Sequence, residues 1–216
     1  YKEFQHVLKH IFKGFINAEL GRYEEALKDI REGRRVMLLS ESEQHFAFIG
    51  TYAFILAQSG NISQAISVLD EVMPEVLKKK HKWDEALIQM GYGQIEFIRN
   101  NYEKAIEYYT KAVPIQKRSA RPTVEYNLAI AYIRNSQPEK AVPLLERFTT
   151  QIEGLAMWFP SLVVLAHYHL GTAYEAMGEK AKAARQYETF LDIWKEADTE
   201  LKEINDAKKR LANLKS

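Results

Sequence analysis

The sequence has no cysteine and almost no net charge. Its 216 residues include 30 basic and 29 acidic side chains. Without cysteine the chain has no disulfide framework, no thiolate-bound zinc or iron–sulfur centre and no thiol nucleophile. A net charge of +1 provides no overall attraction to nucleic acid or to a membrane surface. No continuous run of about 18 apolar residues occurs, so we expect no membrane-spanning segment.

Recognisable catalytic and nucleotide-binding motifs are also missing. No phosphate-binding GxxxxGK[ST] or GxGxxG motif, no HExxH zinc motif and no GxSxG nucleophile motif occurs. His6 and His10 stand one helical turn apart and could hold a metal ion, but neither a carboxylate nor a third ligand accompanies them in that region. We therefore interpret them as surface histidines, and we expect no enzymatic activity, no metal and no cofactor.

Five segments of the chain repeat one pattern. In each, a small residue lies in an apolar helical stretch, a break follows, and an alanine lies inside a second amphipathic stretch. The segments are 14–27, 53–66, 93–106, 129–142 and 171–184. Their shared alanines are Ala26, Ala65, Ala105, Ala141 and Ala183. The breaks contain Gly21, Gly60, Asn100, Ser136 and Gly178. Glycine or asparagine at a break suits the left-handed residue that closes a helix.

Each segment therefore predicts a helical hairpin, and these hairpins resemble the tetratricopeptide repeat, a unit of about 34 residues. Alignment on the shared alanine places the units at 7–40, 46–79, 86–119, 122–155 and 164–197. The small position of the first helix is then Gly14, Ala53, Gly93, Ala129 and Gly171. The large position late in the second helix is Ile30, Leu69, Tyr109, Leu145 and Tyr187. The early tryptophan position of the family is mostly unmatched, and no late proline ends the second helices.

The resemblance implies an all-α fold, a right-handed α-solenoid of five helix pairs in which large side chains fill the grooves between stacked hairpins. We expect the repeat array at residues 1–197 and a C-terminal capping helix at 198–216. The cap has one narrow apolar stripe, formed by Leu201, Ile204, Ala207, Leu211 and Leu214. No such cap precedes the first unit, so we expect further repeats before it in a larger protein.

The C-terminal stretch carries a second, looser resemblance. Residues 190–214 are similar to the ends of helical-repeat regions in large multidomain bacterial signalling proteins. In those proteins the repeats follow a kinase, cyclase or DNA-binding module, and no such module is present in this sequence. We expect a cytoplasmic protein.

In the family that the repeats resemble, first helices line a concave groove that binds partners. The corresponding positions here are more apolar than a solvated helix face should be. The expected groove residues are Leu8, Ile11, Phe15, Phe54, Met90, Gln94, Phe97, Tyr126, Ile130, Ile133, Leu165 and Tyr168. Contiguous apolar surface usually marks an interaction site, although part of it could instead pack between neighbouring first helices. No lysine occupies the positions at which some members of the family clamp chaperone tails. We therefore expect an apolar helix or an extended segment as the ligand.

Two other surfaces lie between the repeats. A basic rim is formed by Lys78, Lys79, Lys80, Lys82, Lys117, Arg118 and Arg121. It could bind phosphate or an acidic partner, or its lysines could simply complement helix dipoles. Nucleic acid is the weaker alternative, because no aromatic side chains alternate with these charges. Trp158 and Phe159 lie in the longest linker, where they could fill a seam or form a binding patch.

Taken together, these patterns predict a non-catalytic scaffold that binds a protein or peptide. The alternative is an assembly module that self-associates through its uncapped N-terminal end.

Overall fold

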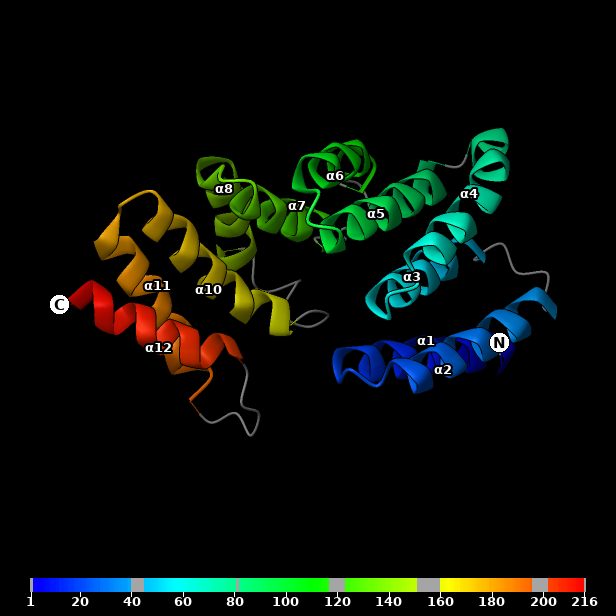
Figure 1. Cartoon of the computed structure of the whole chain (residues 1–216), viewed down its shortest axis with the longest axis horizontal. Coiled ribbons are helices and arrows are strands. Elements are labelled where there is room, and N and C mark those ends of the chain that lie inside the picture. Colours follow the sequence, from blue (N-terminus) through cyan, green and yellow to red (C-terminus); the bar gives the residue numbers. More distant parts are fainter. Residues whose placement is uncertain are drawn as a thin grey trace. The chain divides into compact units, whose positions relative to one another are not determined.

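The computed structural model describes residues 2–39, 45–80, 82–116, 123–150, 160–195 and 202–215. Within these ranges the chain forms helices joined by short turns, and no strand occurs. Five helix pairs are followed by a single helix (Figure 1): α1 (Lys2–Glu19) with α2 (Tyr23–Leu39), α3 (His45–Gln58) with α4 (Ile62–Lys79), α5 (Lys82–Ile98) with α6 (Tyr102–Gln116), α7 (Thr123–Arg134) with α8 (Pro138–Thr150), α10 (Pro160–Ala176) with α11 (Lys180–Ile193), and α12 (Lys202–Lys215). The predicted fold class, five hairpins and a terminal helix, is confirmed.

A residue in the left-handed conformation follows the first helix of each hairpin. These residues are Gly21, Gly60, Asn100, Ser136 and Gly178, with φ between 57° and 85°. In each turn two backbone N–H groups donate to carbonyls of the preceding helical turn. In the first hairpin, Gly21 N–H donates to Ala18 O at 3.0 Å and Arg22 N–H to Asn17 O at 2.8 Å. This bonding satisfies carbonyls that a helix end would otherwise leave without a partner. The prediction for the five breaks is therefore confirmed.

Small side chains allow the two helices of a hairpin to approach closely. The five shared alanines, which are Ala26, Ala65, Ala105, Ala141 and Ala183, have no exposed surface. A Cβ atom added to Gly93 would lie 2.6 Å from the ring of Tyr109. One added to Gly171 would lie 2.5 Å from the ring of Tyr187. Carbon atoms pack at about 3.5–4.0 Å, so only glycine fits against these two rings.

The helices form two compact units, residues 1–120 and 121–216. In the first unit α3 packs against both α1 and α5, so the three first helices form one layer. The second helices α2 and α4 each pack against the first helix of the next hairpin. In the second unit α10 packs against α7, α8 and α11. Each unit has its own apolar core, so each can be described by itself.

The C-terminal helix α12 packs against α11 as its apolar stripe predicts. Ala207 has no exposed surface, and Ile204, Leu211 and Leu214 pack against the core of the second unit. Leu201, the first residue of the predicted stripe, lies outside the described residues. A single apolar stripe turned to the core leaves the remaining faces of α12 polar, which is the property of a terminal cap in a stacked array.

Candidate partner-binding site

Ten of the twelve expected groove residues are half-buried, neither enclosed nor fully exposed. We refer to these ten as the first-helix face: Leu8, Ile11, Phe54, Met90, Gln94 and Phe97 in the first unit, and Ile130, Ile133, Leu165 and Tyr168 in the second. Phe15 lies in α1, but its side chain is outside the described part of the chain. Because equivalent repeat positions on stacked first helices face the same side, we expect the members of each unit to share one surface.

In the first unit, a glycine on α3 allows α3 and α5 to pack closely. A Cβ atom added to Gly50 on α3 would lie 3.4 Å from the backbone oxygen of Leu87 on α5. Phe54 on α3 is partly buried and packs against the apolar core of this unit. On α5, the ring of Phe97 meets the ring of Tyr102 edge to face, with centroids 5.3 Å apart. The surface thus combines rigid aromatic side chains with one amide, that of Gln94.

Tyr126 does not belong to this exposed surface, contrary to the sequence prediction. Only 7% of its surface is exposed. Its ring packs between Phe148 and His169, with centroid distances of 5.4 and 5.8 Å. Burial raises the pKa of its hydroxyl, and Glu203 adds a smaller effect in the same direction. The reason for the correction is that α10 lies against α7 and covers this position with His169.

The C-terminal end of the first-helix face is bonded to α12. The hydroxyl of Tyr168 donates to Asp206 at 2.8 Å, and burial together with this bond raises the pKa of the hydroxyl to about 12. Glu175 accepts hydrogen bonds from Tyr187 at 2.8 Å and from Arg210 at 3.0 Å. Of the members of the face in the second unit, Tyr168 is therefore hydrogen-bonded to α12. The other three members, Ile130, Ile133 and Leu165, have apolar side chains that form no hydrogen bonds.

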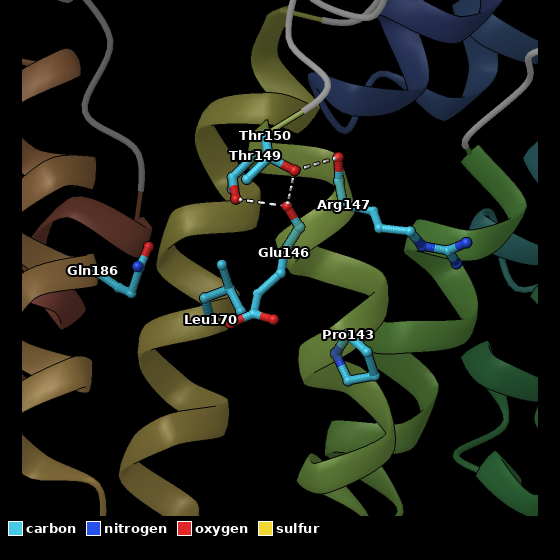
Figure 2. Close-up of a pocket in the computed structure, with 7 residues that line it drawn as sticks. All are labelled: Pro143, Glu146, Arg147, Thr149, Thr150, Leu170 and Gln186. Carbon is cyan, nitrogen blue, oxygen red and sulfur yellow. Dashed lines mark hydrogen bonds between the residues drawn. The ribbon is translucent and has the colours of Figure 1, made fainter.

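A depression of about 710 Å³ lies on the second unit, between α8, α10 and α11 (Figure 2). Side chains that line this depression form hydrogen bonds within the fold. Tyr174 donates to Glu146 at 2.5 Å, and Gln186 bonds His167 at 2.8 Å. The hydroxyl of Thr150 donates to the backbone oxygen of Glu146 at 2.9 Å. These groups stabilise packed helices, and no nucleophile lies beside a base among the residues that line the depression.

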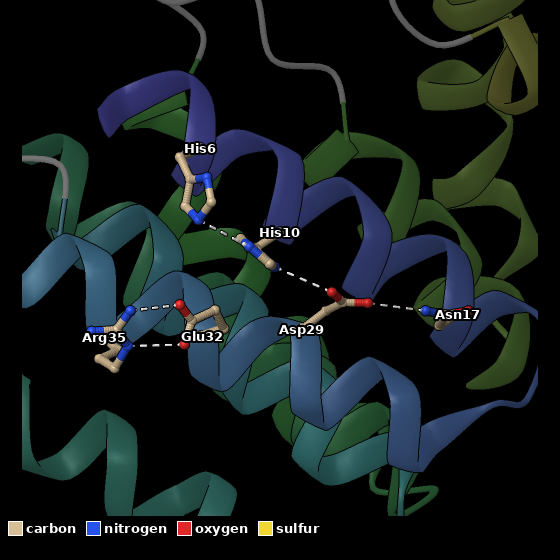
Figure 3. Close-up of polar contacts among 6 residues, drawn as sticks. All are labelled: His6, His10, Asn17, Asp29, Glu32 and Arg35. Atoms are coloured by element: carbon tan, nitrogen blue, oxygen red, sulfur yellow. Dashed lines mark hydrogen bonds and ion pairs between the residues drawn. The ribbon is translucent and has the colours of Figure 1, made fainter. Parts of the chain in front are cut away.

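A histidine cluster lies on the first hairpin (Figure 3). His6 and His10 place their Nε2 atoms 3.3 Å apart, and His10 Nδ1 lies 3.1 Å from Asp29 Oδ1 on α2. Glu32, one turn further along α2, holds Arg35 through bonds of 2.9 and 2.7 Å. The bond from Arg35 lowers the pKa of Glu32, and the two histidines add smaller effects in the same direction. The sequence could not reveal this cluster, because Asp29 stands 19 residues from His10 on another helix.

The first helix also carries an exposed apolar stripe that sequence reasoning missed. Phe12, Ile16 and Leu20 are exposed by 63%, 58% and 58%. At the repeat position of Ile16, the later hairpins have Ile55 and Ile95, which are exposed by 0% and 1% because the preceding hairpin covers them. Large apolar residues recur here at intervals of four, at Phe12, Ile16 and Leu20. This interval is the signal in the sequence that could have revealed the stripe.

The basic rim is only partly within the described residues. Lys78 and Lys80 are exposed at the end of α4, where Lys80 has a left-handed conformation. Lys79 belongs to the same helix end, and its side chain is outside the described part. Lys82 lies 3.0 Å from Glu85 in an ion pair. The predictions for Lys117, Arg118 and Arg121, and for Trp158 and Phe159, fall outside the described residues.

Two features are absent from the residues that the structure describes. None of their helices has the length and the apolar character that a membrane-spanning segment needs. They also hold no group of three or more histidine or acidic side chains arranged to bind a metal ion.

Solved structures that are similar to this chain include tetratricopeptide repeat proteins. A putative kinesin light chain from Podosopora anserina with nearly identical tetratricopeptide-like repeats has a TM-score of 0.60 at 20% identity, over 89% of this chain and 97% of that one. A tetratricopeptide repeat protein from Parabacteroides merdae has a TM-score of 0.56 at 12% identity, over 97% of this chain and 72% of that one. At these identities the similarity shows the fold alone.

Relatives and a family profile also match this chain in sequence. The photosystem I assembly protein Ycf3 of Acaryochloris marina is 25% identical over 137 residues, which are 63% of this chain and 82% of Ycf3. The human intraflagellar transport protein 88 homolog is 22% identical over 148 residues, which are 67% of this chain and only 17% of that protein. The tetratricopeptide repeat family profile matches residues 55–121 and 126–198, more than half of the chain. The chain therefore belongs to the tetratricopeptide repeat family.

Proposed function

We propose that this protein is a non-catalytic scaffold that binds a protein or peptide through the first-helix face. The observation that carries the proposal is the set of half-buried apolar side chains on adjacent first helices, above all Phe54, Met90 and Phe97 on α3 and α5. A folded protein gains little from leaving such side chains in contact with water, and contiguous apolar surface usually serves an interaction.

The expected ligand is an apolar helix or an extended segment. Each square ångström of apolar surface removed from water contributes roughly 25 cal/mol, and the aromatic rings supply large contact areas. The helices that carry them are held by buried cores, so little ordering is required when a ligand binds. Gln94 offers a hydrogen-bonding group that would favour one register of the ligand over others.

Membership of the family supports an interaction role. Repeats of this kind generally mediate protein–protein contacts or assembly, and one distant relative is named as an assembly protein for photosystem I. From these likenesses we take over only the general role of binding other proteins, and not a particular partner.

Selection from a library of displayed peptides tests the proposal. We expect apolar sequences to be enriched, and Phe54→Glu or Phe97→Glu to weaken binding of a selected peptide more than about tenfold. The matched control is Leu77→Glu, an exposed apolar position on α4 in the same unit, which should bind as the wild type does. Circular dichroism must show equal helicity in all variants. Equal losses at Leu77 and Phe97, or selection of no peptide, would contradict the proposal.

A second candidate function, self-association, is favoured by the stripe of Phe12, Ile16 and Leu20. The stripe is symmetric about Ile16, so two antiparallel copies of α1 would place Phe12 of each against Leu20 of the other. Three side chains per copy bury far less than the roughly 1,200–2,000 Å² of a standard interface. We therefore expect weak, concentration-dependent dimers.

Sedimentation velocity over a dilution series tests this candidate. The wild-type protein should shift toward a dimer as its concentration rises, and Ile16→Lys should keep it monomeric. Leu77→Lys, at a position exposed to a similar degree, should behave as the wild type does. A wild-type protein that stays monomeric at every concentration would exclude self-association through α1.

A further inference from the structure

The two histidines of α1 have the spacing of a metal-binding pair. Their Nε2 atoms face one another at 3.3 Å (Figure 3). Two nitrogen ligands at 2.0–2.1 Å from a tetrahedral zinc ion are themselves about 3.3–3.4 Å apart. A single ion between the two rings would therefore require little movement of either side chain. Because His6 and His10 are one helical turn apart, the backbone of α1 keeps them on the same face.

Asp29 supplies the second feature of such a site. It lies on α2, and its Oδ1 is 3.1 Å from His10 Nδ1. A carboxylate at Nδ1 keeps the proton on that nitrogen, so that the lone pair of the ring is on Nε2, the atom that faces His6. The other oxygen of Asp29 accepts a hydrogen bond from Asn17 Nδ2 at 3.2 Å. Asn17 thus orients Asp29, and Asp29 orients His10.

His6 is exposed, so water can reach the remaining coordination positions of an ion bound there. A depression of about 460 Å³ adjoins the cluster and is lined by His10, Asp29, Glu32, Lys28, Arg31 and Arg35. Its cationic side chains disfavour a site built on charge alone, so affinity must come from the two imidazole nitrogens. Imidazole suits zinc, copper and nickel, whereas magnesium and calcium prefer oxygen ligands.

We propose that His6 and His10 form a two-histidine site for a divalent transition-metal ion such as Zn²⁺, with Asp29 as the positioning residue for His10. The remaining coordination positions take water. In the metal-free protein the Nε2–H of His6 donates to the Nε2 of His10. When the ion binds, the proton of His6 moves to Nδ1, and both Nε2 lone pairs point to the ion. This site is independent of the proposed partner-binding function.

Isothermal titration of the intact protein with Zn²⁺ alone tests the assignment. We expect one saturable site, and we expect His6→Ala and His10→Ala each to abolish it. Asp29→Asn should weaken it about 10- to 100-fold, as is usual for carboxylates behind metal-binding histidines. His167→Ala is the control, since His167 bonds Gln186 in the second unit, and it should bind Zn²⁺ as the wild type does.

A spectroscopic measurement separates this role of the histidines from a merely structural one. With Cu²⁺ as the probe, the electron paramagnetic resonance spectrum should show coupling to two equivalent nitrogens in the wild type and to fewer in His6→Ala. His6 is exposed, so that variant should keep the helicity of the wild type. Absence of a saturable Zn²⁺ site in the wild type, or unchanged binding by either histidine variant, would overturn the proposal. Unchanged affinity in Asp29→Asn would overturn the role given to Asp29.

Discussion

The contact between Gly93 and Tyr109 offers a quantitative test of how the hairpins pack. Substitution of Gly93 by alanine adds a Cβ atom 2.6 and 2.7 Å from two ring carbons of Tyr109. The ring would have to move by roughly 1 Å to reach normal contact distance. Tyr109 is only 2% exposed, so its ring cannot relieve the overlap by turning into solvent.

The expected size of the effect follows from two opposing contributions. Alanine is favoured over glycine in a helix by about 1 kcal/mol, whereas an overpacked core loses about 1–3 kcal/mol. Gly50→Ala measures the helix preference of alanine without overpacking. Its added Cβ atom would lie 3.4 Å from Leu87 O, which is an ordinary contact. We therefore expect Gly93→Ala to have a free energy of unfolding about 1–3 kcal/mol lower than that of Gly50→Ala.

A second substitution should relieve the overlap. The second and fourth hairpins combine alanine with leucine at the two equivalent positions, as in Ala53 with Leu69. The double variant Gly93→Ala/Tyr109→Leu reproduces that combination in the third hairpin. We expect the two changes to be non-additive, with a favourable coupling of about 0.5–3 kcal/mol.

Urea denaturation followed by circular dichroism at 222 nm measures these differences. The midpoint for Gly93→Ala should lie below the midpoint for Gly50→Ala, with the slope of the transition unchanged. Equal midpoints, or additive effects in the double variant, would refute the packing argument. They would show that the alignment pairs the wrong positions of the two helices.

Two further predictions concern the second unit. Ser136 has a φ of 57°, and Ser136→Gly should raise the free energy of unfolding by about 1 kcal/mol, because glycine adopts this conformation without strain. Asn100→Gly should raise the free energy of unfolding by less. Equal increases in the two variants, or a decrease in Ser136→Gly, measured by denaturation, would contradict the reasoning. Burial, with a smaller effect from Arg134, lowers the pKa of His169 to about 3. The ring therefore stays neutral in the folded protein but becomes protonated in the unfolded chain as the pH drops below about 6.5. The free energy of unfolding should fall by up to about 2 kcal/mol between pH 7 and about pH 5. His169→Asn should remove this loss, and a variant as acid-sensitive as the wild type would show that another group is responsible.

Local features of the fold could be predicted from the sequence. The breaks were predictable because a left-handed helix end selects glycine or asparagine, and residues such as Gly60 and Asn100 mark it directly. The buried alanines were predictable because they recur in phase. Both signals depend on neighbours within a few residues or on a repeated position, and the sequence displays such relationships plainly.

Features that depend on contacts between helices were not predictable. Tyr126 and Phe97 both stand at expected groove positions, yet Tyr126 is buried because α10 carries His169 against it. The bond between His10 and Asp29 joins two helices, and helical periodicity contains no signal for it. The bonds of Tyr168 and Glu175 to α12 depend likewise on where the cap docks.

Site-specific photocrosslinking in the cells that produce this protein tests the proposed partner-binding surface most directly. A photoreactive phenylalanine analogue would replace Phe97 on the first-helix face in one variant and Leu77 on α4 in another. Binding through the first-helix face predicts a discrete crosslinked species from position 97 and none from position 77. Crosslinks from position 77 alone would contradict the account and place the partner on the second helices.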